Sequence, residues 1–304
     1  MVLTPRKPGE PPFTLVKVTP TQKGKSFKEI KWLNTAQHAR LKNACLKVDD
    51  LYATSDIFLV VKDNFHALCE LLRVVSKHHP APDTKLARRP ILREVVNTAS
   101  AFRMFLDHLD SEGKSKLGDA IADELKQAQS REYDSSLSYR LCYQLRNHAT
   151  HKGFPSLDVS IRSSVEGDSK TASASHYGPG SFTAVLVSIK RDELLRDKEK
   201  LNAKVRNELK NLEEKIELVE HFRSAVEALE RIHSLYVQKR DNALQSELQL
   251  LGESISGETL AENEWITLFD QPTPIGNKRK QLFSLSYTNY PMDALRKFRQ
   301  TQKC

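Results

Sequence analysis

The stretch YDSSLSYRLCYQLRNHATHKGFP, residues 133–155, carries the strongest fold signal in the sequence. Its apolar residues recur at three- and four-residue spacing, which predicts an amphipathic helix with one buried face: Leu137, Leu141, Cys142, Leu145 and Ala149. Asp134 and the following serines are good N-caps, so the helix is expected to begin within residues 133–136. Gly153, with Pro155 two residues later, is the expected stop.

Helical periodicity also dominates the sequence before this stretch. Helices are expected from Trp32 to His79, from Pro90 to Asp110 and from Ala120 to Gln129. Pro90 is expected at the first position of its helix, where a missing N–H is tolerated.

Helix is expected again from Asp192 to about Leu251, with a break near Lys200. Five apolar residues follow heptad spacing: Val205, Leu209, Leu212, Ile216 and Val219. Two interpretations remain open, an amphipathic helix packed on the body of the protein and a dimerisation helix.

Between these helical regions the periodicity changes to two. Leu157, Val159 and Ile161 alternate with polar residues, and Phe182–Ile189 is a second β-like run. The two runs predict a β-hairpin with a long, mobile loop. Further strands are expected at Phe13–Val18, as an edge strand, and at Gln281–Tyr287.

The predicted fold class is therefore mainly α, a helical bundle with an inserted β-hairpin and a long C-terminal helical region. The expected segments are a loosely ordered basic arm, the bundle, the hairpin, the long amphipathic helices and a mixed basic C-terminal segment, at residues 1–30, 31–156, 157–190, 191–252 and 253–304. The last segment contains two basic clusters, at 277–280 and 295–299.

Charge and composition narrow the functional classes. Lys and Arg outnumber Asp and Glu by 47 to 39 in 304 residues, which gives a net charge of +8 and favours a polyanionic partner, nucleic acid before membrane. The four cysteines are scattered, which argues against a disulfide framework or a cysteine zinc site. There is no apolar stretch of membrane-spanning length and no signal-like N-terminus, so the expected location is the cytoplasm.

Several common chemistries lack their motifs. The chain has no Walker loop, no G-x-G-x-x-G and no G-x-S-x-G, which disfavours ATP hydrolysis, dinucleotide chemistry and esterase chemistry. There is no H-E-x-x-H pattern either, and no metal or other cofactor is expected.

The polar side of the opening helix carries a different chemistry. Asn147 and His151 stand four residues apart and are neighbours on one surface, with Arg146 beside them. His151 lies in the last turn, where the helix dipole favours the imidazolium form. An imidazole can move protons while a guanidinium holds the oxygens of a phosphate, so the pair suits phosphodiester cleavage.

The spacing of the arginine and the histidine is weak evidence by itself. Arg73 with His78, and Arg103 with His108, have the same spacing, which is expected by chance in a chain of this composition. In both of those pairs an apolar residue follows the arginine, whereas the polar Asn147 follows Arg146.

The segment LRNHATH, residues 145–151, resembles the R-polar-x-x-x-H motif of HEPN domains, named for higher eukaryotes and prokaryotes nucleotide-binding. The longer stretch quoted above is similar to bacterial members whose motif helix ends in H-x-G-hydrophobic-P. LREVVNTASAFRMFLDHLD, residues 92–110, also resembles the helix that precedes the motif in this family. The resemblance covers roughly residues 90–160.

The resemblance implies a helical bundle that pairs as a homodimer and acts as a metal-independent endoribonuclease. Arg146 would hold the scissile phosphate, His151 would transfer protons and Asn147 would position His151 or the substrate. Accessory candidates are His148, Asn97 and Tyr143, while Gly153 and Pro155 would be structural. The RNA 2′-hydroxyl would attack the phosphate and leave a 2′,3′-cyclic phosphate.

Bacterial relatives often act as toxins or phage-defence effectors, which implies an antitoxin or another regulator as a further partner. Some HEPN toxins carry a modifiable tyrosine two residues after the motif histidine, where this chain has Gly153. Two alternatives remain: a HEPN-like protein that binds RNA or a nucleotide without cutting it, and a helical scaffold that binds another protein through Leu194–Leu251.

Overall fold

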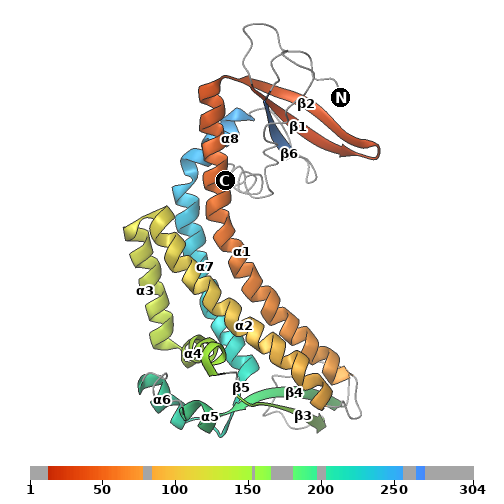
Figure 1. Ribbon diagram of the computed structural model, residues 1–304, viewed down its shortest axis with the longest axis vertical. Helices are drawn as coiled ribbons and strands as arrows, with labels where there is room; N and C mark the ends of the chain where they lie inside the picture. The colour runs from red at the N-terminus through yellow and green to blue at the C-terminus, as the bar shows by residue number, and fades with distance from the viewer. Residues whose placement is uncertain are drawn as a thin grey trace. The chain divides into compact units, whose positions relative to one another are not determined.

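The computed structural model describes residues 13–77, 84–152, 155–165, 181–196, 203–255 and 265–270 (Figure 1). These residues are mainly helical, which confirms the predicted fold class at that level. The chain forms two compact units, one of Met1–Ala53 with Lys239–Cys304 and one of Thr54–Gln238. The division falls inside two helices, α1 (Thr35–Lys77) and α7 (Leu218–Ala243).

The first unit contains an antiparallel sheet with the strand order β2-β1-β6. Its strands are β1 (Phe13–Thr21), β2 (Gly24–Leu33) and β6 (Trp265–Asp270). The prediction of a loosely ordered arm over residues 1–30 is therefore wrong for residues 13–30, which form β1, the turn after it and most of β2. The strand expected at Phe13–Val18 is present as β1, but it is central and not an edge strand, because it pairs with its hairpin neighbour β2 and also with β6, a segment far away in the sequence. Local sequence cannot show such a partner.

Helix α1 begins at Thr35, slightly later than expected, because Trp32 and Leu33 belong to β2. Its start has reciprocal capping: the Gln37 N–H donates to Asn34 Oδ1 at 2.9 Å, and the Asn34 N–H donates to Gln37 Oε1 at 3.0 Å. In the same unit, α8 (Gln245–Ser254) is joined to α1 by the Lys47–Glu247 ion pair at 2.6 Å.

The second unit is built around α2 (Thr84–Glu112), α3 (Asp119–Ser135) and α4 (Leu137–Lys152), with a π-helical turn η1 (Gly113–Leu117) between the first two. Aromatic rings connect the helices. Phe102 of α2 meets Tyr139 of α4 edge to face at 5.1 Å, and Phe58 of α1 stacks on His233 of α7 at 4.3 Å. Burial of these rings provides a large apolar contribution to the core.

Two helix boundaries differ from expectation in this unit. Helix α2 begins at Thr84, so Pro90 lies inside the helix and not at its first position. The proline has no N–H to donate a hydrogen bond to the carbonyl of Leu86. Leu86 itself is 77% exposed, so water can hydrate that carbonyl. Helix α3 extends to Ser135, beyond the expected end at Gln129. The end of α4 at Lys152 agrees with the stop expected at Gly153.

The predicted hairpin is confirmed. Strand β3 (Leu157–Val165) pairs antiparallel with β4 (Ser181–Lys190), in a register that places Leu157 opposite Ile189. A third strand, β5 (Lys215–Glu217), pairs with the other edge of β4. The loop between β3 and β4 lies outside the described residues, as do the expected strand at Gln281–Tyr287 and the two basic clusters of the C-terminal segment.

The prediction of nearly continuous helix from Asp192 to Leu251 is wrong. The region contains α5 (Arg191–Leu195), α6 (Ala203–Lys210), β5, α7 and α8. The apolar residues at heptad spacing are buried from separate elements: Val205 and Leu209 from α6 and Ile216 from the sheet. The heptad-like spacing therefore does not belong to one continuous helix, because these apolar residues enter the same core from separate elements.

Helix α7 uses its apolar stripe within its own unit, in agreement with the packed-helix interpretation. Seven of its side chains are buried in the core of that unit: Leu218, Phe222, Ala225, Ala228, Leu229, Ile232 and Tyr236. A partner protein could not reach this stripe without opening the core.

Candidate functional site

One face of helix α4 is buried in the core. Leu141, Cys142 and Leu145 of the predicted stripe lie in the core, and Leu137 is partly buried. Ser136 caps the helix, since its Oγ accepts a hydrogen bond from the Tyr139 N–H at 3.2 Å. The side chain of Ala149 lies outside the described residues.

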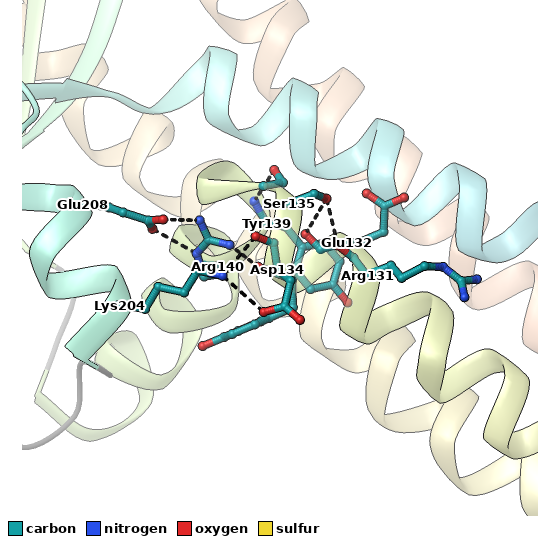
Figure 2. Close-up of polar contacts among 10 residues, drawn as sticks. Arg131, Glu132, Asp134, Ser135, Tyr139, Arg140, Lys204 and Glu208 are labelled. Atoms are coloured by element: carbon teal, nitrogen blue, oxygen red, sulfur yellow. Dashed lines mark hydrogen bonds and ion pairs between the residues drawn. The ribbon is translucent and has the colours of Figure 1, made fainter.

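A buried arginine that the sequence analysis missed anchors the start of α4 (Figure 2). The side chain of Arg140 is 3% exposed and makes a bidentate ion pair with Glu208 of α6, with Nε–Oε2 at 3.0 Å and Nη2–Oε1 at 2.7 Å. Its Nη1 also donates to the backbone carbonyl of Tyr133. Nearby, Lys204 of α6 pairs with Asp134 at 3.2 Å. The Arg140–Glu208 pair holds α4 against α6, and the Lys204–Asp134 pair joins α6 to α3.

Next to α4 lies a cavity of about 720 Å³, within the second unit. Its lining combines apolar, amide, hydroxyl and charged side chains from three helices: Val60 and Asn64 of α1; Asn97, Ser100, Ala101, Met104, Asp107, His108 and Ser111 of α2; and Arg146 of α4. The α2 residues follow helical spacing and form one face of that helix.

The cavity brings together two of the candidates from the sequence, Arg146 and Asn97. Asn147, His148 and His151 belong to α4, but their side chains lie outside the described residues. Gly153 is also outside them, and Pro155 is buried directly before β3.

Tyr143, the third accessory candidate, takes part in helix packing. The guanidinium carbon of Arg103 lies 4.3 Å from the centroid of the Tyr143 ring, a cation–π contact between α2 and α4. The Tyr143 ring also meets that of Tyr133 edge to face at 6.1 Å. These contacts support the helix pair next to the cavity.

The charged groups around the cavity suit a bound anion. Asp107 is the carboxylate in the lining, and Arg103 forms an ion pair with it at 2.6 Å. This arginine offsets the negative charge, so a phosphate beside Arg146 meets less repulsion. Arg103 thus has a structural role, consistent with a chance match to the motif.

His108, which the sequence analysis treated as part of the same chance match, lies in the cavity lining. The signal that could have found it is the spacing from Asn97 through Ala101 and Met104 to His108, which places all four on one face of α2.

A hydrogen-bonded pair lies on another side of α4. Ser138 Oγ is 2.8 Å from Nδ1 of His221, and the Cys142 thiol donates to the His221 carbonyl at 3.7 Å. Burial lowers the pKa of His221, and the negative charge of Glu220 offsets this only in part. Burial also raises the pKa of the Cys142 thiol, so this cysteine behaves as an apolar core residue.

None of the described helices combines the length and the apolar character needed to cross a bilayer. Among the described side chains, no group of three or more His, Cys, Asp or Glu is placed to hold a metal ion.

Comparisons with known proteins find no match for this chain. No protein-family model matches the chain, and no curated protein or solved structure matches it.

Proposed function

We propose that this protein is a HEPN-type, metal-independent endoribonuclease. The observation that carries the proposal is the cavity of about 720 Å³ that Arg146 of the motif lines together with Asn97 and the polar face of α2. A cationic fork at the edge of a cavity with amide and hydroxyl groups is suited to a phosphodiester and its neighbouring nucleotide.

The proposed reaction is an internal transesterification. Arg146 binds the non-bridging oxygens of the scissile phosphate and offsets the charge that develops on them. His151, five residues later in α4, transfers protons, and Asn147 positions it or the substrate. The 2′-oxygen forms a bond to phosphorus while the bond to the 5′-oxygen breaks, which yields a 2′,3′-cyclic phosphate and a 5′-hydroxyl.

The same proposal includes the assembly and the biological role that the resemblance implies. Two copies pair so that their Arg146/His151 sets face one cleft, and the activity arrests growth as a toxin or phage-defence effector under an antitoxin or another regulator. Light scattering tests the pairing at micromolar concentration. A fully active monomer contradicts it.

The cleavage assay uses purified full-length protein, labelled RNA and EDTA. We expect the wild type to cut, with a 2′,3′-cyclic phosphate at the new 3′ end, and both Arg146→Ala and His151→Ala to lose at least about 10²-fold in rate. Asn207→Ala is the control, because Asn207 is an exposed residue of α6 outside the cavity lining. Equal cutting by the wild type and both alanine variants would assign the activity to a contaminant.

Binding of RNA without cutting by the wild type would favour the non-catalytic alternative. The scaffold alternative is disfavoured by the buried stripe of α7. Overexpression separates it further, since a scaffold is as harmless as its His151→Ala variant, whereas a nuclease arrests growth only as the wild type.

A further inference from the structure

Two of the side chains that line the cavity beside Arg146 are apolar and exposed to solvent. Val60 is 38% exposed and Met104 is 43% exposed, and both line the cavity. Exposed apolar groups that converge in a concave, partly polar site are typical of a surface that a ligand covers. A flat, apolar-faced group would fit such a lining.

Two carboxamides in the lining have orientations that their neighbours determine. Asn64 Nδ2 donates to the carbonyl of Val60 at 2.7 Å, and Asn97 Nδ2 donates to Glu94 Oε2 at 3.3 Å. Both partners are acceptors only, so the nitrogen and not the oxygen of each amide must face them. The carboxamide oxygens are therefore the groups that these two residues can offer to a ligand as acceptors.

We propose that this cavity binds an unpaired nucleobase that carries an exocyclic amino group, adenine or cytosine in preference to uracil. The base packs against Met104 and Val60, and its amino group donates to the carboxamide oxygens of Asn64 and Asn97. Arg146 binds the phosphate of the same nucleotide. This rests on the proposed function, because the base belongs to the RNA strand whose phosphate Arg146 holds.

The preference follows from counting donors and acceptors. Adenine and cytosine each present an amino group with two N–H donors, whereas uracil presents two carbonyl acceptors and a single ring N–H. Uracil carbonyls placed against the two amide oxygens would leave acceptors facing each other. Uracil therefore loses a hydrogen bond that adenine and cytosine make and places unpaired acceptors together, so the preference is about tenfold or more in Kd.

The test measures binding of mononucleotides to the full-length wild-type protein in EDTA by titration calorimetry. We expect AMP and CMP to bind about tenfold more tightly than UMP. Inosine monophosphate, in which a carbonyl replaces the amino group of adenine, should bind about as weakly as UMP. This comparison needs no variant, so it does not depend on how a substitution affects folding.

Variants then locate the preference. Asn64→Ala and Asn97→Ala should each reduce the ratio of the UMP dissociation constant to the AMP dissociation constant. Met104→Ala should weaken the binding of all the nucleotides by a similar factor. Asn207→Ala is the matched control, because Asn207 is an exposed asparagine of the same unit on α6, outside the cavity lining. Its ratio should equal that of the wild type.

Four results would overturn the inference: UMP or inosine monophosphate binding as tightly as AMP, an unchanged ratio in both asparagine variants, a ratio equally reduced in Asn207→Ala, or ribose 5-phosphate binding as tightly as AMP. The last would show an anion site only. Because binding is measured without cleavage, a protein that prefers AMP but cuts no RNA would retain the base site and lose the ribonuclease. A protein that cuts RNA through Arg146 without any base preference would do the reverse.

Discussion

Replacement of Arg140 by methionine tests whether the buried ion pair at the start of α4 stabilises the second unit. The change keeps most of the apolar volume but removes the two bonds to Glu208 and the one to the carbonyl of Tyr133. Removing one partner of a buried pair typically costs about 3–5 kcal/mol, since the other charge stays without compensation. The carboxylate of Glu208 is 32% exposed and can regain some water, so we expect about 3 kcal/mol.

The chain offers a control ion pair in which both side chains are exposed. Arg73 donates from Nε and Nη2 to Oε2 of Glu70 at 2.8 and 2.6 Å, and the two side chains are 37% and 62% exposed. Exposed pairs contribute about 0–1 kcal/mol, so Arg73→Met should shift the unfolding midpoint very little. The double variant Arg140→Met/Glu208→Met should recover part of the loss, because it no longer leaves a carboxylate behind.

Urea unfolding, followed by far-ultraviolet circular dichroism, measures the free energy of unfolding of the wild type and of each variant. Both tryptophans, Trp32 and Trp265, belong to the first unit, so tryptophan fluorescence reports on that unit separately. Equal shifts for Arg140→Met and Arg73→Met would refute the argument, because the contacts of the ion pair and not their burial would then determine the contribution.

Three further outcomes are expected. Leu145→Ala, in the fully buried stripe of α4, should cost about 3 kcal/mol in the free energy of unfolding by urea titration, and a loss below about 1 kcal/mol would mean that the helix does not pack as described. The lowered pKa of His221 means that the unfolded chain binds its proton first, so stability should fall as pH drops below the ordinary value of 6.5, by up to about 1.4 kcal/mol per pH unit. His221→Gln keeps a hydrogen-bonding partner for Ser138 but cannot titrate, so its melting temperature should depend less on pH than that of the wild type between about pH 7.5 and about pH 5.5. An unchanged pH dependence in the variant would contradict the assignment to His221. Cys142 should resist iodoacetamide in the native protein at neutral pH and react in urea, as peptide mass spectrometry would show, and rapid native labelling would contradict its burial.

The elements that sequence patterns predicted well are those with local signals. The end of α4 before Gly153 follows from residue types that interrupt a helix wherever they occur, and the β3–β4 hairpin follows from a change of period to two. The elements that were missed depend on distant partners. Strand β5 has only three residues and exists because it extends the edge of β4, and β6 pairs with β1 from the far end of the chain.

The same distinction applies to the candidate site. Arg146 and Asn97 could be named from motif resemblance, but their common place in one cavity depends on how α2 and α4 pack. His108 has the spacing of a chance match and yet lines that cavity, while Arg103 of the same match packs on Tyr143. Spacing along a helix identifies which residues share a face, but not which face remains open.

The sequence by itself determined the mainly helical class, the position of the motif helix and its buried stripe, because periodicity and capping act over one or two helical turns. Only the tertiary structure decided that Arg140 is a buried anchor, that the apparent heptads belong to separate elements and that three helices line an open cavity beside Arg146. Those outcomes depend on which surfaces exclude water from one another, and that is a property of packing between residues far apart in the chain.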